Sequence, residues 1–217
     1  MLGDDYETLN RKVVCGVPET RIPEWVRRRI LGNGVNNLGP YIRPEYRDIT
    51  YFYGIDYHQD IIDWKDRGAD FVTLYVYPDD VGKDDAPLHV LTGSHRFGAT
   101  VFPHKLERLD GGRWRYTGDN GLSADLDERV LVGPAGYVAM WHSATLHGTM
   151  PTTADRQRIS LRYLYAKKSG SSGEIDRVNE TLRGALSLTS TRVDLGEDGA
   201  AVIRKNTINQ QREPASE

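Results

Sequence analysis

Two histidines and one aspartate form the strongest chemical signal in this sequence. His58 and Asp60 lie two residues apart, and His147 lies far downstream. On an extended strand, residues i and i+2 project to the same face, so His58 and Asp60 can present an imidazole and a carboxylate to one point. If His147 closes the same point, the set matches the two-histidine, one-carboxylate facial triad of non-haem iron(II) sites, which leaves positions open for other ligands.

The spacing alone is a weak signal. A His-X-Asp tripeptide arises often by chance, and a single histidine on a strand is more often a structural residue than a metal ligand. The third ligand must also come from a distant segment, so the fold decides whether the three side chains can meet.

The elements that must position these residues are predicted to be mainly β. Short runs rich in β-branched and aromatic residues alternate with turn signals, which is typical of an antiparallel jelly roll, or double-stranded β-helix. Such a fold brings early and late strands together. The predicted strands cover residues 49–53, 71–77, 87–91, 113–116, 129–132, 137–141, 146–149 and 158–165.

We expect one domain over residues 1–217. Within it, residues 1–48 are predicted as a helical and loop part with a short helix near 23–31, and residues 49–166 as the jelly-roll core. Residues 167–217 are predicted as a C-terminal helix, near 174–182, and a polar tail.

Composition excludes several classes of function. The formal net charge of -3 indicates no strong nucleic-acid field. The single cysteine, Cys15, cannot form an intrachain disulfide and is interpreted as unreactive. The first residues do not form a signal peptide, and no stretch is apolar enough to span a membrane, so we expect a cytoplasmic protein acting on a small molecule.

Four passages, in order, resemble the phytanoyl-CoA dioxygenase family of iron(II)- and 2-oxoglutarate-dependent oxygenases. Together they span roughly residues 50–166 and are much more specific than any one of them. Thr92 stands where the family usually has proline, and Thr149 where serine is common. The passages are His58-Gln59-Asp60, Leu74 to Arg96 with the turn Thr92-Gly93-Ser94-His95, Trp141 to Thr149, and Arg156 to Leu161.

The resemblance implies a metal centre of His58, Asp60 and His147. His142, five residues before His147, is the competing ligand, and the match selects His147. His95 is expected to stabilise a turn, as in the family. Because a carboxylate ligand is present, hydroxylation is favoured over halogenation.

The resemblance also implies a cosubstrate site. The family's arginine for the distal carboxylate of 2-oxoglutarate falls at Arg158, and a guanidinium can grip a carboxylate with two parallel hydrogen bonds. Arg156 and Arg162 share its predicted strand face and are the alternatives. Further contacts to 2-oxoglutarate are expected from Thr149, Tyr75 and Gln59.

The resulting hypothesis is an enzyme that uses Fe(II), 2-oxoglutarate and O2 to oxidise a small molecule, releasing succinate and CO2. Two alternatives remain: a metal-dependent jelly-roll enzyme that does not use 2-oxoglutarate, and a metal-free binding module. The long connection from about residue 97 to residue 129 is a candidate lid over the site.

Overall fold

The structure is a computed structural model that describes residues 6–31, 35–60, 71–98, 100, 104–118 and 121–168. The predicted C-terminal helix near 174–182 lies outside these residues. Helical elements are short and come mostly before the sheet core: η1 (Glu19–Arg21), α1 (Glu24–Ile30), η2 (Gly39–Tyr41), η3 (Pro44–Tyr46) and η5 (Ser94–Phe97). None of the helices in the described part of the chain is long and apolar enough to cross a bilayer.

Strands dominate the described residues. They are β1 (Tyr6–Gly16), β2 (Val35–Asn37), β3 (Ile49–His58), β4 (Phe71–Tyr77), β5 (Leu88–Leu91), β6 (Lys105–Leu109), β7 (Arg113–Thr117), β8 (Ser123–Leu131), β9 (Tyr137–His142), β10 (His147–Thr149) and β11 (Arg158–Lys167). They pair in the order β6-β7-β8-β5-β10-β3-β1-β11-β4-β9, with β2 beside β3.

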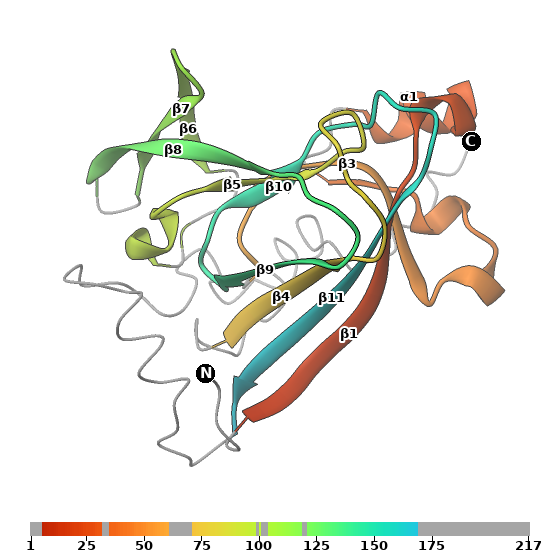
Figure 1. The fold of residues 1–217 in the computed structure, drawn as a ribbon. Helices are drawn as coiled ribbons and strands as arrows, with labels where there is room; N and C mark the ends of the chain where they lie inside the picture. Colours follow the sequence, from red (N-terminus) through yellow and green to blue (C-terminus); the bar gives the residue numbers. More distant parts are fainter. Residues whose placement is uncertain are drawn as a thin grey trace, which may run out of the picture.

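This order is that of a jelly roll, which confirms the predicted fold class. One layer has the order β8-β5-β10-β3 and the other β1-β11-β4-β9. Neighbours within each layer pair antiparallel, whereas β1 and β3 pair in parallel and join the layers along one side. Figure 1 shows β1, β11 and β4 side by side, with β8, β5 and β10 crossing opposite them.

Strand β1 lies in a part of the chain that was predicted as helix and loop. Its first half carries polar residues such as Glu7, Asn10 and Arg11, so its local pattern does not indicate a strand. Its pairing with β11 spans Tyr6 to Gly16, and this long-range ladder sets its conformation. The predicted helix near 23–31 is confirmed as α1.

The candidate lid between residues 97 and 129 is largely sheet. Strands β6 and β7 form a hairpin, and β7 pairs with β8, which in turn pairs with β5. Tyr116 and Leu126 from these strands pack with Tyr57 and Leu91 behind the β3 and β5 layer. The described residues of this connection are therefore held against the sheet by buried apolar side chains, and their role as a lid stays a prediction.

The space between the two layers contains the main apolar cluster. Alternate residues of a strand point to the same side, so each strand contributes every second side chain. The buried members are Val14, Phe52, Ile55, Tyr75, Tyr77, Val81, Leu88 and Trp141. One end of this interior remains a pocket.

Candidate metal centre and adjoining pocket

The three predicted ligands converge at the end of the interior. His58 is the last residue of β3, Asp60 follows it, and His147 begins β10, which pairs with β3 so that His147 faces His58. One nitrogen or oxygen of each residue lies within 4.8 Å of the others, and all three residues are buried. A chain folded in this way can therefore bind one metal ion with residues from two distant segments.

Backbone carbonyls orient both imidazoles. The Nδ1 atom of His58 lies 2.9 Å from the carbonyl oxygen of Asp56, and Nδ1 of His147 lies 2.9 Å from that of Thr145. Since a carbonyl oxygen can only accept, each Nδ1 carries the proton and each Nε2 keeps a lone pair. Burial lowers the pKa of both histidines, and the neighbouring His147 lowers that of His58 further. Neutral imidazole is the form that binds metals.

The two oxygens of Asp60 have different surroundings. Oδ2 accepts hydrogen bonds from the hydroxyl of Thr73 and, over 3.2 Å, from Nε1 of Trp141. Oδ1 lies 3.6 Å from Nε2 of His147 and accepts a 2.7 Å hydrogen bond from Arg162. Burial alone would raise the pKa of the Asp60 carboxyl, but the charge of Arg162, reinforced by the two histidines and Thr73, holds it well below its ordinary value. Asp60 is thus ionised, which is the form that binds a metal ion.

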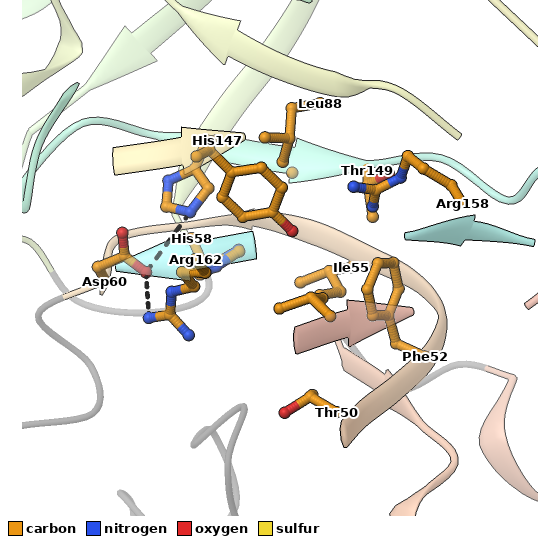
Figure 2. A pocket seen from close by; sticks show the side chains of 13 residues that line it. Thr50, Phe52, Ile55, His58, Asp60, Leu88, His147, Thr149, Arg158 and Arg162 are labelled. Carbon is orange, nitrogen blue, oxygen red and sulfur yellow. Dashed lines mark hydrogen bonds and ion pairs between the residues drawn. The ribbon is translucent and has the colours of Figure 1, made fainter. Parts of the chain in front are cut away.

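A pocket opens beside these ligands (Figure 2). Its empty volume is about 420 Å³, counting the part open to solvent. Its lining combines an apolar wall with the three candidate ligands and two arginines. The lining residues are Val14, Thr50, Phe52, Ile55, His58, Asp60, Tyr75, Leu88, His147, Gly148, Thr149, Arg158 and Arg162.

Arg158 lies in this pocket as predicted and is 2% exposed. One of its terminal nitrogens donates to the hydroxyl of Ser160, while its Nε and other terminal nitrogen have no hydrogen-bond partner among the described residues. Its guanidinium carbon lies 5.4 Å from the ring centre of Phe52, 5.9 Å from that of Tyr75 and 5.8 Å from that of Tyr77. A buried cation with donors that have no partner among the described residues favours an anionic ligand, and the fork of N–H groups fits a carboxylate.

The alternatives to Arg158 have other positions. Arg156 is half-exposed and binds the carboxylate of Asp85 through two nitrogens, outside the pocket. Arg162 lines the pocket at the metal end, on Asp60. The strand period predicts that Arg162 shares the pocket face with Arg158, because residues 158, 160 and 162 lie on one side, but it does not predict the contact with Asp60.

The remaining predicted contacts divide into two groups. Tyr75 and Thr149 line the pocket, although the Thr149 hydroxyl donates to the carbonyl oxygens of Ala86 and Pro87, at 2.8 and 3.1 Å. Gln59 is not among the lining residues. Its amide nitrogen donates to the carbonyl oxygens of Gly98 and Ala144, and its oxygen accepts from the backbone of Thr100. We therefore reassign Gln59 to holding these loops together.

His142 and Cys15 lie near the centre but do not belong to it. The Nδ1 atom of His142 accepts a 3.1 Å hydrogen bond from the backbone of Ala144, and His142 is not one of the three clustered candidate ligands. Burial raises the pKa of the Cys15 thiol to about 11. The thiol is therefore protonated at neutral pH, as expected of an unreactive cysteine.

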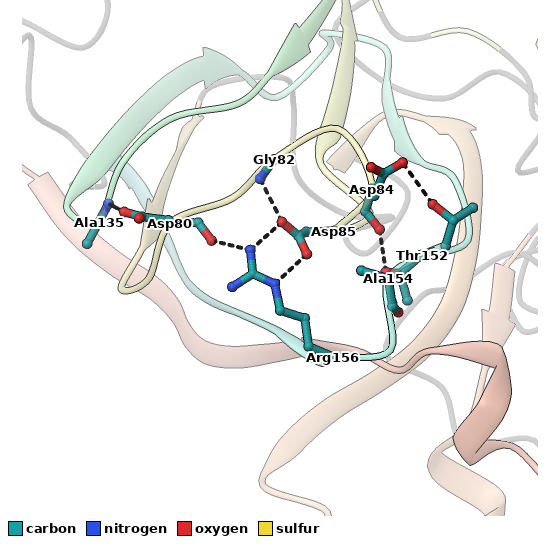
Figure 3. Close-up of polar contacts among 9 residues, drawn as sticks. Asp80, Gly82, Asp84, Asp85, Ala135, Thr152, Ala154 and Arg156 are labelled. Carbon is teal, nitrogen blue, oxygen red and sulfur yellow. Dashed lines mark hydrogen bonds and ion pairs between the residues drawn. The ribbon is translucent and has the colours of Figure 1, made fainter.

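A polar clamp holds the loops beside the pocket (Figure 3). The carbonyl oxygen of Asp84 accepts hydrogen bonds from the backbone of Thr153 and Ala154 and from the hydroxyl of Thr152. The neighbouring Asp85 carboxylate binds Arg156 and the backbone of Gly82. The connection that precedes Arg158 is thereby attached to the loop that precedes β5.

Comparisons with known proteins agree with this arrangement. The family model described as phytanoyl-CoA dioxygenase (PhyH) matches residues 20–160. A probable alpha-ketoglutarate-dependent hypophosphite dioxygenase of Stutzerimonas stutzeri is 29% identical over 117 residues, which cover 52% of this chain and 39% of that protein. The L-proline trans-4-hydroxylase of Streptomyces griseoviridis is 26% identical over 125 residues, which cover 50% of this chain and 47% of that protein. The chain therefore spans less than half the length of both curated relatives.

Among solved structures, EvdO2 from Micromonospora carbonacea var. aurantiaca is 15% identical, with a TM-score of 0.44. The match covers 81% of this chain and 59% of that one.

Proposed function

This chain belongs to the phytanoyl-CoA dioxygenase family, and from that premise we propose that it is a non-haem iron(II) oxygenase. In this proposal it uses 2-oxoglutarate and O2 to hydroxylate, or otherwise oxidise, a small molecule, with release of succinate and CO2. His58, Asp60 and His147 bind the iron, and Arg158 binds the far carboxylate of 2-oxoglutarate.

One observation in particular supports 2-oxoglutarate as the cosubstrate. The buried guanidinium of Arg158 has two donor nitrogens without a partner among the described residues, and it lines the same pocket as the three candidate metal ligands. A metal-dependent enzyme without 2-oxoglutarate, or a binding module without metal, would need another anionic ligand for this cation. Burying such a charge is costly, so its retention points to an anionic ligand.

The donor set fits iron(II). Two neutral imidazole nitrogens and one ionised carboxylate oxygen suit a divalent transition metal and occupy one side of its coordination sphere. When bound, iron(II) supplies the activation of O2 that no protein side chain can perform. The chain's own residues then orient the reactants: the backbone fixes both histidines, and Thr73 and Trp141 fix Asp60.

The pocket walls support a role for the protein in binding and shielding. Arg158 fixes one end of a dicarboxylate, so its other end points along the pocket toward the candidate metal position. Phe52, Ile55 and Leu88 form an apolar wall that excludes water from the reacting atoms. Tyr75 contacts residues at both ends of the pocket. Its ring stacks on Trp141 near the candidate metal position and lies beside Arg158 at the other end.

We place the substrate among small metabolites. The names of the two curated relatives contain hypophosphite and L-proline, which are both small molecules. We also assign the protein to the cytoplasm, where 2-oxoglutarate is a central metabolite.

The test is turnover of the cosubstrate. Protein loaded anaerobically with Fe(II) is mixed with 2-oxoglutarate, O2 and a metabolite library, and succinate is measured. We expect at least one metabolite to stimulate succinate release, with no release from His147→Ala. Succinate release that is equal in the two proteins would overturn the proposal, as would failure of 2-oxoglutarate to bind the metal-loaded chain.

A further inference from the structure

Arg162 is a second buried cation in the pocket, and the proposed reaction assigns it no task. It lies on β11, four residues after Arg158 and on the same strand face, and both arginines line the pocket. Figure 2 shows Arg162 beside Asp60 and Arg158 at the far end, beyond Ile55 and near Phe52. The two cations therefore mark opposite ends of one cavity.

Arg162 contacts the carboxylate oxygen that faces the candidate metal position. Oδ2 of Asp60 is held by Thr73 and Trp141, whereas Oδ1 faces Nε2 of His147 at 3.6 Å. Arg162 donates to this same Oδ1 over 2.7 Å. A metal ion bound by the two histidines and Oδ1 would thus share its carboxylate oxygen with a guanidinium.

Such sharing is electrostatically unfavourable. Asp60 and Arg162 are both buried, so charges at this end of the pocket are poorly screened by water. Asp60 is the single carboxylate among the described residues that line the pocket, and its Oδ1 would face both a divalent ion and the guanidinium of Arg162. A dianion entering the pocket changes this balance, because one carboxylate meets Arg158 and the other lies near the metal ion and Arg162.

We propose that Arg162 couples metal binding to binding of the cosubstrate dianion, an inference that rests on the proposed function. Without the dianion, Arg162 weakens the hold of the site on a divalent ion by competing for Asp60. With the dianion bound, the added negative charge offsets this competition and the ion is retained. Arg162 is thus a positioning residue that acts through Asp60 and makes metal and 2-oxoglutarate strengthen one another's binding.

The experiment is a binding cycle that needs no turnover. Mn(II), a probe that does not react with O2, is titrated by calorimetry into the metal-stripped full chain, with and without saturating 2-oxoglutarate. Wild type is compared with Arg162→Gln and Arg162→Met, which remove the charge, and with Arg162→Lys, which keeps it. Arg129→Gln, at an exposed arginine on β8, controls for the change in net charge.

Without 2-oxoglutarate, we expect either charge-free variant to bind Mn(II) about tenfold more tightly than wild type. With 2-oxoglutarate, this difference should shrink to about twofold or less, which is a coupling of about fivefold or more. Such a coupling is of the size common between two ligands, and by reciprocity Mn(II) should strengthen 2-oxoglutarate binding more in wild type than in the variants. Arg162→Lys and Arg129→Gln should behave like wild type.

The proposal is overturned if folded Arg162→Gln or Arg162→Met binds Mn(II) no more tightly than wild type, or if 2-oxoglutarate leaves the difference unchanged. A purely structural role would lower stability without producing this dependence on 2-oxoglutarate. The proposed function fails in a distinguishable way: wild type itself would then bind no more Mn(II) than His147→Ala.

Discussion

His147 and His58 face each other directly across the pair formed by β10 and β3, and their ring centres lie 4.3 Å apart. Strand β10 is only three residues long, so few backbone hydrogen bonds determine its position. The close approach of the two strands depends on Gly148. A Cβ atom there would lie 2.7 Å from the carbonyl oxygen of Ile55.

The first prediction concerns Gly148→Ala. The added methyl group must push β10 away from β3, because the atoms it meets are backbone. We expect a loss of about 1–3 kcal/mol in the free energy of unfolding, together with weaker Mn(II) binding. Denaturant unfolding and calorimetry measure both. In Gly16→Ala, the new Cβ would lie 3.7 Å from its neighbours, an ordinary contact, so this control should lose little stability. Equal behaviour of the two variants would contradict the assignment.

The second prediction separates metal from cosubstrate. Arg158→Met removes the cation expected to bind the far carboxylate but leaves the three metal ligands in place. We expect 2-oxoglutarate to bind about 30-fold or more weakly, a loss of roughly 2–3 kcal/mol, while Mn(II) affinity in its absence stays near wild type. Stability should not fall, because the variant replaces an uncompensated buried charge with an apolar chain. Strong destabilisation with unchanged 2-oxoglutarate affinity would identify Arg158 as a structural residue instead.

Local patterns predict much of the jelly roll. Strands β4 and β11 coincide with runs of β-branched and aromatic residues, and the pairing of β11 with β4 keeps these runs in register. Strand β1 has no comparable pattern in its first half, because its partner β11 supplies the missing stabilisation. Its pairing depends on contacts between the two ends of the described chain, which no local window contains.

The candidate site was likewise predictable from the sequence only in part. The proximity of His58 and Asp60 was predicted from strand spacing, although β3 ends at His58 and Asp60 lies just beyond it. The meeting with His147 followed from the family resemblance. The position of Arg162 on Asp60 was not predicted, since spacing alone does not distinguish three arginines on one strand face. Gln59 was predicted to touch the cosubstrate, but its amide nitrogen donates to the carbonyl oxygens of Gly98 and Ala144.

The third prediction concerns the support of Asp60. Thr73→Val keeps the shape of the side chain but removes the hydroxyl that donates to Oδ2. Losing one donor to a buried carboxylate should cost about 1–3 kcal/mol of stability and weaken Mn(II) binding by about tenfold, the effect expected of a group that orients a metal ligand. Thr73→Ser, which retains the hydroxyl, should restore most of the Mn(II) affinity. If valine and serine give the same affinity, Thr73 does not orient Asp60.

The last prediction concerns the clamp beside the pocket and its dependence on pH. Hydrogen bonds from Arg156 hold the pKa of the Asp85 carboxyl below its ordinary value. The group is thus ionised more readily in the folded chain than in the unfolded one. Its contribution to stability is complete above the unfolded pKa, near 3.9, and is lost as the pH falls through the folded value.

We therefore expect Asp85→Asn to be about 1–2 kcal/mol less stable than wild type between pH 5 and 8, with the gap closing below about pH 4. Urea unfolding at a series of pH values measures this difference. Asp110→Asn, at an exposed aspartate in the β6–β7 turn, should show a small difference at every pH because the same charge is removed without a partner. A gap for Asp85→Asn that widens on acidification would show that Arg156 does not stabilise the ionised carboxylate. The connection leading to Arg158 would then depend on the Asp84 carbonyl contacts instead.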